Sequence, residues 1–498
     1  MRKSLFLVCT TWLYAFQAGT SAKFVVTPEI QGALNHVRAD SLRGDLSFIS
    51  SDLLEGRGTP SRGLDIAAEY IAAQFRRAGL EPGGTEGYFQ TARMVVLEPN
   101  MSAFELRVTH GKQAVIADPA DIVLGTAKAT DLNDAPLFKL DLADTSFIES
   151  MTPAQLDGKA VIMEFTANSQ ANFRAVGQKL RQAKPLLLVS VSRTEGPKRP
   201  TEGQLSDPDQ PRTATPRLNW NGPAAAALYD SLPAGATPAS LSIHLAPPHE
   251  TAVSPRNVLG ILRGSDAALK DSYLLVTAHY DHLGMLAEGS GDRIYNGAND
   301  DGSGTVSVIE VARALSSLKT RPRRSIVFMT FFGEEKGLMG SRYFAKHPVI
   351  PLEKIAGQIN LEQLGRTDDK EGSRIATATV TGFDYSNITD SIRAAGDLTG
   401  IKIFKHPKNS DLYFTASDNA SLAEAGVPAH TIGVTFEFPD YHGLGDEWQK
   451  IDFDNLAKVD RMVALATIMV ADNDKAPQWS EENPRTKNFV KASKELHH

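Results

Sequence analysis

From residue 257 onward, the sequence alternates between short, nearly continuous apolar runs and longer amphipathic stretches. Apolar runs lie at 273–278, 325–332, 355–361 and 427–434, and a helical pattern covers 306–318. Strands that alternate with helices predict a largely parallel sheet. Strands as continuously apolar as Ile326-Val327-Phe328-Met329 are typical of a sheet buried on both faces. We therefore expect an α/β fold in which a mixed, largely parallel sheet is sandwiched by helices.

The first half of the chain has a different pattern of apolar and polar residues. Residues 66–75 carry apolar side chains at helical spacing. Residues 121–245 contain short β-like runs at 160–165, 185–191 and 240–245, without a cluster of potential metal ligands. We expect 23–120 to be the N-terminal segment of the main α/β domain, 121–245 a small inserted β-rich domain, 246–475 the rest of the main domain, and 476–498 a polar tail.

The N-terminus has the pattern of an export signal. Arg2 and Lys3 precede an apolar stretch at 5–16, and the small residues of 20–22 suit a cleavage site. The apolar stretch is shorter than the ~20 residues of a membrane helix. The sequence therefore predicts a signal peptide at 1–22, a secreted or periplasmic product, and no stable membrane insertion after cleavage. The alternative is a signal that stays uncleaved as a membrane anchor.

Composition narrows the possible partners. The chain has 52 Lys and Arg against 59 Asp and Glu, a formal net charge of -7, and no basic tract, which argues against nucleic acid. The one cysteine, Cys9, lies inside the predicted signal, so we expect no disulfide in the mature protein. Nothing in the sequence selects an oligomeric state.

Imidazole and carboxylate side chains follow the predicted strands of the second half. His279 comes directly after 273–278, Glu334 and Glu335 after 325–332, and Glu362 at the end of 355–361. In open α/β sheets, sites form at the carboxyl ends of the strands. We therefore expect these side chains to share one site.

Two residues after His279, Asp281 would lie on the same face of an extended strand. Its carboxylate could then accept a hydrogen bond from the second ring nitrogen of the histidine, which would fix the tautomer and make the histidine a better metal ligand. The alternative is an ordinary surface His-Asp pair. His282 is interpreted only as a neighbour.

The turn at 296–304 carries adjacent carboxylates, Asp300 and Asp301, among small residues. A calcium loop would need alternate acidic spacing and a distant glutamate, which this turn lacks. An ordinary helix cap is the other alternative.

Glu334 and Glu335 follow a strongly apolar strand, where charge needs compensation. A dication would supply it, with one carboxylate binding the metal and the other addressing an activated water. A lone Glu-Glu pair could equally be a solvated helix start. The loop at 440–447 adds His442, and histidine is a common metal ligand.

Together these segments resemble the co-catalytic di-zinc aminopeptidases, a family that includes secreted bacterial leucine aminopeptidases, aminopeptidase Y and the more distant glutamate carboxypeptidases. The matching segments are AHYDHLG at 278–284, NGANDDGSG at 296–304, GEEKGLMGS at 333–341, NLEQLGR at 360–366, DYH at 440–442, and more weakly LLEGRG at 53–58. By position and texture, 121–245 resembles the protease-associated domain often inserted in this family.

The resemblance implies a site with two Zn²⁺ ions per chain. Asp300 would bridge the ions, with His279 and Glu362 completing one site and Glu335 and His442 the other. Glu334 would be the general base for attack by a metal-bridging water on the N-terminal bond of peptide substrates, and Asp281 would support His279. The resemblance also implies a cis peptide bond after Asp300. Cobalt or manganese stay open as alternative metals.

Two departures from the family pattern affect the expected site. Glu362 stands where the family usually has aspartate, so zinc affinity or metal spacing could differ. Gly443-Leu444 stands where Thr-Pro is usual, which makes the pocket rim more flexible.

Neither departure removes a ligand type, so we expect an exported zinc metallo-exopeptidase of the aminopeptidase type. The alternatives are a related di-zinc dipeptidase, carboxypeptidase or amidase, a one-zinc glutaminyl cyclase, and a non-enzymatic binding protein on a peptidase fold.

Overall fold

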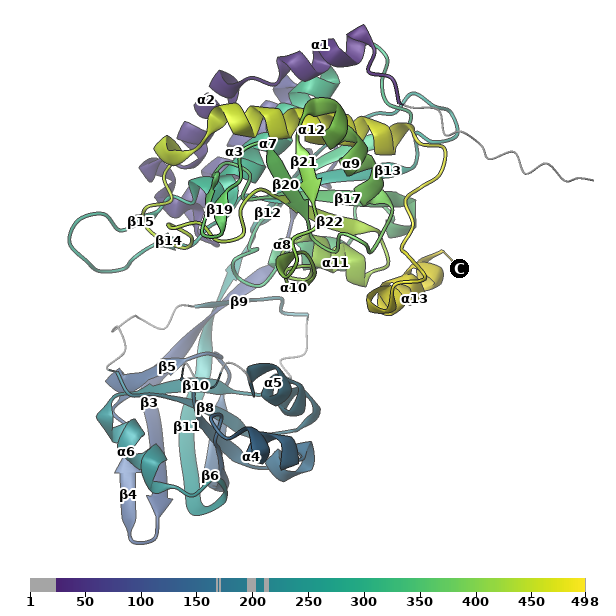
Figure 1. Cartoon of the computed structure of the whole chain (residues 1–498). Helices are drawn as coiled ribbons and strands as arrows, with labels where there is room; N and C mark the ends of the chain where they lie inside the picture. Colours follow the sequence, from purple (N-terminus) through teal and green to yellow (C-terminus); the bar gives the residue numbers. More distant parts are fainter. Residues whose placement is uncertain (1–23, 167–168, 170–171, 195–202, 210–214, 498) are drawn as a thin grey trace, which may run out of the picture.

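The computed structural model describes residues 24–497 apart from 167–168, 170–171, 195–202 and 210–214. The predicted signal peptide at 1–22 lies outside the described residues. Within them, the chain builds two nine-stranded sheets, each with its own apolar core (Figure 1).

The larger sheet is mixed, and its centre is parallel. Its order is β1 (Glu81–Pro82), β12 (Arg256–Leu262), β16 (Ser325–Phe331), β13 (Tyr273–His279), β17 (Ile355–Glu362), β22 (Ala429–Gly433), β20 (Thr377–Val380) and β21 (Lys402–Phe404), with β2 (Phe89–Thr91) beside β12. The neighbours β16, β13, β17 and β22 run parallel, whereas β12 is antiparallel to β16 and β20 is antiparallel to β22. The predicted mixed, largely parallel sheet is confirmed.

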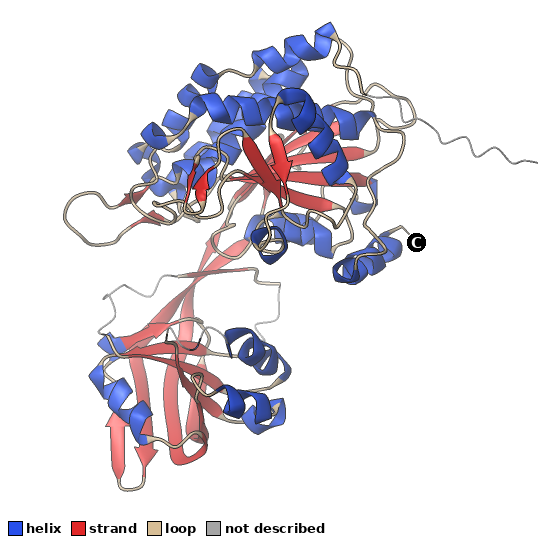
Figure 2. Cartoon of the chain, viewed as in Figure 1, coloured by secondary structure: helices blue, strands red, loops and turns tan. Residues whose placement is uncertain are grey.

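Helices cover both faces of this sheet (Figure 2). One face packs against α1 (Pro28–His36), α2 (Ala39–Ile49), α3 (Arg62–Arg77), α7 (Gly304–Ser316), α9 (Ile388–Thr399) and α12 (Phe453–Asp472). The other face packs against α8 (Met339–Lys346), α11 (Asn419–Glu424) and α13 (Lys487–Leu496). Successive residues of β13 point to opposite faces, so Leu274 and Val276 enter one core and Leu275 the other.

The second sheet takes strands from both sides of the predicted 121–245 segment. Its order is β4 (Gln113–Ile116), β3 (Met94–His110), β11 (Gly235–Val253), β6 (Thr130–Leu140), β7 (Ala160–Glu164), β8 (Leu187–Ser192), β10 (Arg217–Asn221) and β5 (Ile122–Leu124), with β9 (Gln204–Ser206) beside β3. The long strands β3 and β11 pair with each other and lead from this sheet toward the main one (Figure 1). Three helices, α4 (Thr145–Ser150), α5 (Phe173–Gln182) and α6 (Pro223–Ser231), accompany it.

Short elements complete the connections. They are the helical turns η1 (Asp52–Arg57), η2 (Pro119–Asp121), η3 (Pro153–Leu156), η5 (Ala298–Ser303), η6 (Leu352–Lys354), η7 (Trp448–Lys450) and η8 (Pro484–Thr486), the helix α10 (Asn409–Leu412), and the two-stranded ribbons β14 (Gly284–Met285) with β15 (Ile294–Tyr295) and β18 (Asp368–Asp369) with β19 (Gly372–Ser373).

The C-terminal segment differs from the predicted polar tail. Trp479 is buried and donates a hydrogen bond through its indole nitrogen to the Gly426 carbonyl at 2.9 Å. Phe489 of α13 stacks on Trp479, with the ring centroids 5.1 Å apart. These aromatic side chains attach the segment to the core beside α11, although most of its residues are polar. Over the described residues, no helix combines the length and apolarity that crossing a membrane requires.

Candidate metal centre and active site

Three neighbouring parallel strands deliver the predicted site residues to one edge of the main sheet. His279 is the last residue of β13, and Glu362 is the last residue of β17. Glu334 and Glu335 follow β16, which ends at Phe331. Because β16, β13 and β17 are parallel neighbours, their carboxyl ends meet.

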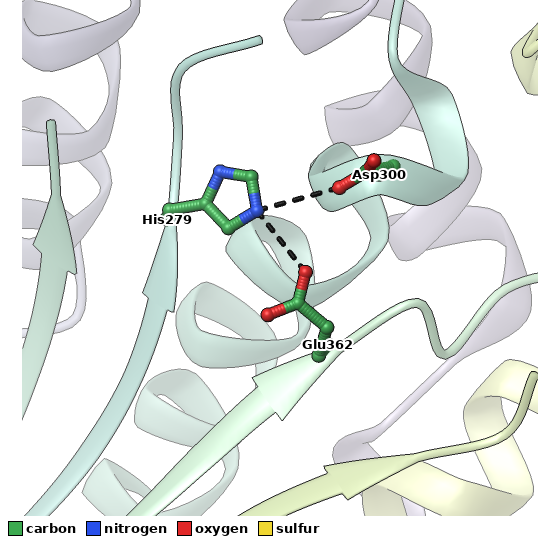
Figure 3. A group of neighbouring side chains, drawn as sticks. All are labelled: His279, Asp300 and Glu362. Carbon is green, nitrogen blue, oxygen red and sulfur yellow. Dashed lines mark hydrogen bonds and ion pairs between the residues drawn. The ribbon is translucent and has the colours of Figure 1, made fainter. Parts of the chain in front are cut away.

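Asp300 reaches the same place from the loop before α7 and contacts the first histidine. His279 Nε2 lies 3.4 Å from Asp300 Oδ1 and 3.2 Å from Glu362 Oε1 (Figure 3). His279 is fully buried, and the Glu362 side chain is 16% exposed. The three side chains converge from separate elements and form one group of possible ligands.

The other oxygen of Asp300 faces a second histidine. His442 Nε2 lies 3.1 Å from Asp300 Oδ2 and 3.4 Å from Glu335 Oε1. His442 comes from an irregular loop, with a left-handed backbone (φ 53°) and a half-exposed side chain. Asp300 therefore lies between two imidazole and carboxylate sets, with one oxygen toward each.

Buried polar atoms in this cluster lack hydrogen-bond partners within the described structure, notably Asp300 Oδ2 and Glu335 Oε1. Burial alone would raise the pKa of Asp300, but its contacts with His279 and His442 hold that pKa well below the usual range. Against burial and the Asp300 charge, His282 and His442 lower the pKa of Glu335 to about 2. Unpaired buried carboxylate oxygens next to imidazole nitrogens fit divalent cations, and imidazole with carboxylate is a usual zinc donor set.

The remaining nitrogen of His279 faces Asp281. His279 Nδ1 lies 3.1 Å from the Asp281 carbonyl oxygen and 3.5 Å from the carboxylate Oδ1. The buried carboxylate accepts hydrogen bonds from Thr59 Oγ1 and from the Glu334 backbone N–H, both at 3.1 Å. Asp281 thus contacts His279 and connects it to the segment that carries Glu334.

Glu334 lines a cavity of about 320 Å³ beside the cluster, together with Asp300, Glu362 and His442. Burial, strengthened by Glu362 and Asp418 and opposed by His279, raises the pKa of Glu334 well above its usual value. The cavity lining also includes Tyr413 and Phe436, whose rings stack with centroids 5.3 Å apart. The cavity therefore places a carboxyl group and an aromatic wall next to the cluster.

Backbone donors fix the Asp300 loop. The carboxylate of Asp446 accepts hydrogen bonds from the N–H groups of Asn299 and Asp300, at 3.0 Å each. Asp301 Oδ1 accepts from Gly304 N at 3.0 Å and Gln363 N at 3.1 Å, which joins this loop to the end of β17. The Asp300-Asp301 peptide bond is cis, as the resemblance implied.

Sequence reasoning gave no role to Ser417, which holds one of the predicted ligands. Its hydroxyl donates to Glu362 Oε2 at 2.5 Å and accepts from the Asn360 side chain at 2.9 Å. The carboxylate of the adjacent Asp418 is fully buried, and burial raises its pKa to about 7. The stretch 416–420 could be flagged from sequence as a possible pocket lining, but a fold-dependent contact across 55 residues has no local signal.

Arg57 and His282 are the other residues that sequence reasoning missed. Arg57 is fully buried and donates to the carbonyl oxygens of Tyr280, Ile49, Asn296 and Gly297 at 2.7–2.9 Å. In the sequence, the only indication of a role for Arg57 was its position in segment 53–58, which matches the family weakly. His282 lies with its Nδ1 2.9 Å from Glu335 Oε1.

Parts of the chain are similar to known peptidases. Residues 257–467 match the family described as "Peptidase family M28". "Aminopeptidase YwaD" of Bacillus subtilis is 26% identical over 238 residues, which are 47% of this chain and 48% of that protein. A "Probable zinc metalloprotease" of Leptosphaeria maculans is 34% identical over 119 residues, 24% of this chain and 26% of that protein. The chain thus spans half or less of the length of these curated relatives.

Solved structures match over nearly the whole chain. An aminopeptidase from Aneurinibacillus sp. strain AM-1 has a TM-score of 0.59 at 19% identity, covering 90% of this chain and 97% of that one. A zinc aminopeptidase from Bacillus subtilis has a TM-score of 0.53 at 18% identity, covering 91% and 98%.

The fold is that of the zinc aminopeptidases, a helix-covered mixed sheet with a site at its strand ends. Residues 257–467, which include His279, Asp300 and His442, are similar to peptidase family M28.

Proposed function

We propose that the protein is an exported, zinc-dependent aminopeptidase that releases N-terminal residues from peptides. The observation that carries this proposal is Asp300, whose two oxygens face two different imidazole and carboxylate sets beside the cavity that Glu334 lines. Such a shared carboxylate suits a pair of cations, and we assign two Zn²⁺ per chain.

Each ligand has a role in this proposal. His279 and Glu362 hold one ion, Glu335 and His442 hold the other, and Asp300 is shared by both. When bound, the zinc ions polarise the scissile carbonyl and make an attacking water more acidic. Asp281 positions His279 through the ring nitrogen that faces away from Glu362.

Glu334 is the general base. It takes a proton from the attacking water and returns it to the leaving amine, a shuttle that requires one carboxyl group within reach of both. Its place on the cavity wall and its raised pKa suit a group that changes protonation during each turnover. In this proposal the peptidase domain is built around the larger sheet, from parts of 23–120 and 246–475. The second sheet, which adds β3 and β4 to the predicted segment 121–245, is a protease-associated-like insertion. Residues 1–22 direct export.

Related reactions would use the same groups, so the experiment must separate them. Purified protein is assayed for metal content and for cleavage of aminoacyl arylamides and N-blocked peptides before chelation, after chelation, and after zinc is restored. The proposal expects zinc-dependent cleavage of unblocked substrates only. Cleavage of N-blocked substrates would instead identify a carboxypeptidase or amidase, and zinc-loaded protein inactive on every substrate would identify a binding protein.

A further inference from the structure

His282 is buried inside the cluster, although its sequence position indicated only a neighbour. Its side chain is 0% exposed, and its Nδ1 lies 2.9 Å from Glu335 Oε1. His282, Glu335 and Asp300 each offer one ligand atom, and these atoms all lie within 4.8 Å of one another. The group repeats the composition of the set at His279, with one imidazole and two carboxylates.

The contact between His282 and Glu335 does not have the geometry of a hydrogen bond. Both ring nitrogens of His282, and Oε1 of Glu335, lack a hydrogen-bond partner in the described structure. At 2.9 Å the distance would permit a bond, so the direction of approach is what excludes it. Leaving such atoms buried and unpaired is energetically unfavourable. Two atoms that bind one cation are expected to approach in this way, since both point at the ion and not at each other.

The backbone around His282 fixes the imidazole in place. A Cβ on Gly297 would lie 2.4 Å from His282 Cγ and 2.5 Å from Cδ2, so only glycine leaves room for the ring. The Gly297 carbonyl is held in turn by Arg57 Nη2 at 2.9 Å, and the His282 N–H donates to the Arg57 carbonyl at 3.3 Å. The ring is therefore rigid before any ion binds.

We propose that His282 is a third imidazole ligand of the metal centre, binding the second cation through Nδ1 beside Glu335 and Asp300. This inference rests on the proposed function, because it assigns a further ligand to one of its two zinc ions. His442 then adds a ligand from a half-exposed loop to a site whose other three ligands are buried. His282 then holds, with a rigid side chain, the same ion that His442 binds from the loop.

A competing role would make His282 an outer partner that orients Glu335. The variant His282→Gln separates the two roles, because a glutamine amide can donate a hydrogen bond to Glu335 but is a poor zinc ligand. His282→Ala removes both possibilities. His244→Gln, a change of the same kind at a half-exposed histidine of the second sheet, is the matched control.

The affinity of each zinc ion is measured by competition with a chelator, and the cobalt-substituted proteins are compared by visible absorption. We expect both His282 variants to weaken one of the two ions by more than the 10–100-fold typical of an outer partner, and to change the cobalt spectrum. The other ion and the His244→Gln control should be unaffected. Full affinity and an unchanged spectrum in His282→Gln would overturn the inference.

A second measurement needs no variant, which matters if the substitutions prevent folding. X-ray absorption of the wild-type protein loaded with two zinc ions counts the imidazole ligands. The inference expects three imidazoles per pair of ions. His279 and His442 alone would supply two. Two imidazoles would overturn the assignment of His282 while leaving the proposed function intact. A wild-type protein that cannot hold two zinc ions would overturn both.

Discussion

Both sheets of the molecule have parallel strands with carboxylates at their carboxyl ends. The two sheets differ in which side chains balance the negative charge of those carboxylates. In the second sheet, Glu164 ends β7 and makes two hydrogen bonds with Arg193, at 2.5 and 2.8 Å, and Arg193 also pairs with Asp230 of α6. Those carboxylates raise the pKa of Arg193 further. The charges there compensate one another.

At the main sheet, the corresponding edge carries Asp300, Glu335 and Glu362 against imidazoles, and buried oxygens remain without hydrogen bonds in the described structure. A histidine offers only a conditional positive charge, because it is neutral unless protonated. The comparison teaches that a carboxylate at a strand end is not by itself a sign of function. A metal site is indicated where the buried carboxylates at a sheet edge have no arginine or lysine of the protein to balance their negative charge.

The largest effect is expected at Glu334. Glu334→Gln removes the proton shuttle but keeps the size of the side chain, so kcat should fall by about 10²–10⁴-fold. Zinc content, measured by atomic emission on the same preparation, should not change. Loss of zinc together with activity would mean that Glu334 binds metal, and full activity would remove it from the mechanism.

His430 should make the main domain sensitive to acid. Burial lowers its pKa to about 4, and the neutral ring donates to the Thr381 carbonyl at 2.8 Å and accepts from Ser386. Between pH 6.5 and 4 the unfolded chain then binds more protons than the folded one, so stability falls as the pH falls through this range. The lowered pKa of His430 corresponds to a loss of about 3 kcal/mol of stability over this range.

The measurement is the denaturant midpoint against pH for wild type and His430→Gln. The variant should start less stable, because it alters a buried hydrogen-bonded group, but should lose less stability on acidification. Parallel curves for the two proteins would show that His430 does not contribute to the acid response. The described histidines of the second sheet are all partly exposed and should give no such effect.

A smaller effect is expected at Ser417. Ser417→Ala removes the hydrogen bond to Glu362 Oε2, and loss of such an outer partner typically weakens metal binding by about 10–100-fold. Zinc competition titration would measure this change. Ser231→Ala, which removes a serine hydrogen bond within α6 of the second domain, is the control and should leave zinc affinity unchanged.

The smallest effect is expected from Asp230→Asn in the second domain. The Asp230 side chain is more than half exposed, and exposed ion pairs contribute little to stability. The thermal midpoint should shift slightly and the zinc content not at all. A loss of zinc in this variant would show that the second sheet influences the metal site, contrary to the expected independence of the two sheets.

The sequence allowed the central elements to be predicted because their signals are local. Continuous apolar runs marked β13, β16 and β17, and the positions of the predicted ligands at their ends followed from the strand-end rule. The antiparallel strand β20 was not predicted, since its four residues give too little pattern. The attachment of α13 was also missed, because two aromatic side chains decide it within a polar segment.

The site shows the same limit. Strand alternation would place residues 279 and 281 on one face and 282 on the other, but β13 ends at His279, so alternation applies to neither Asp281 nor His282. Arg57 and Ser417 act through contacts that span more than 50 residues. Such contacts depend on the completed fold and leave no mark in a local pattern.

The central claim is that the strand ends of the main sheet hold two cations through a shared carboxylate. The most direct test is the number of zinc ions per chain at a fixed free zinc concentration, in wild type and in Asp300→Asn. The account predicts two ions in the wild-type protein and fewer than one in the variant, since both sites lose a charged ligand. One ion or none in the wild type, or two ions retained without the Asp300 carboxylate, would contradict it.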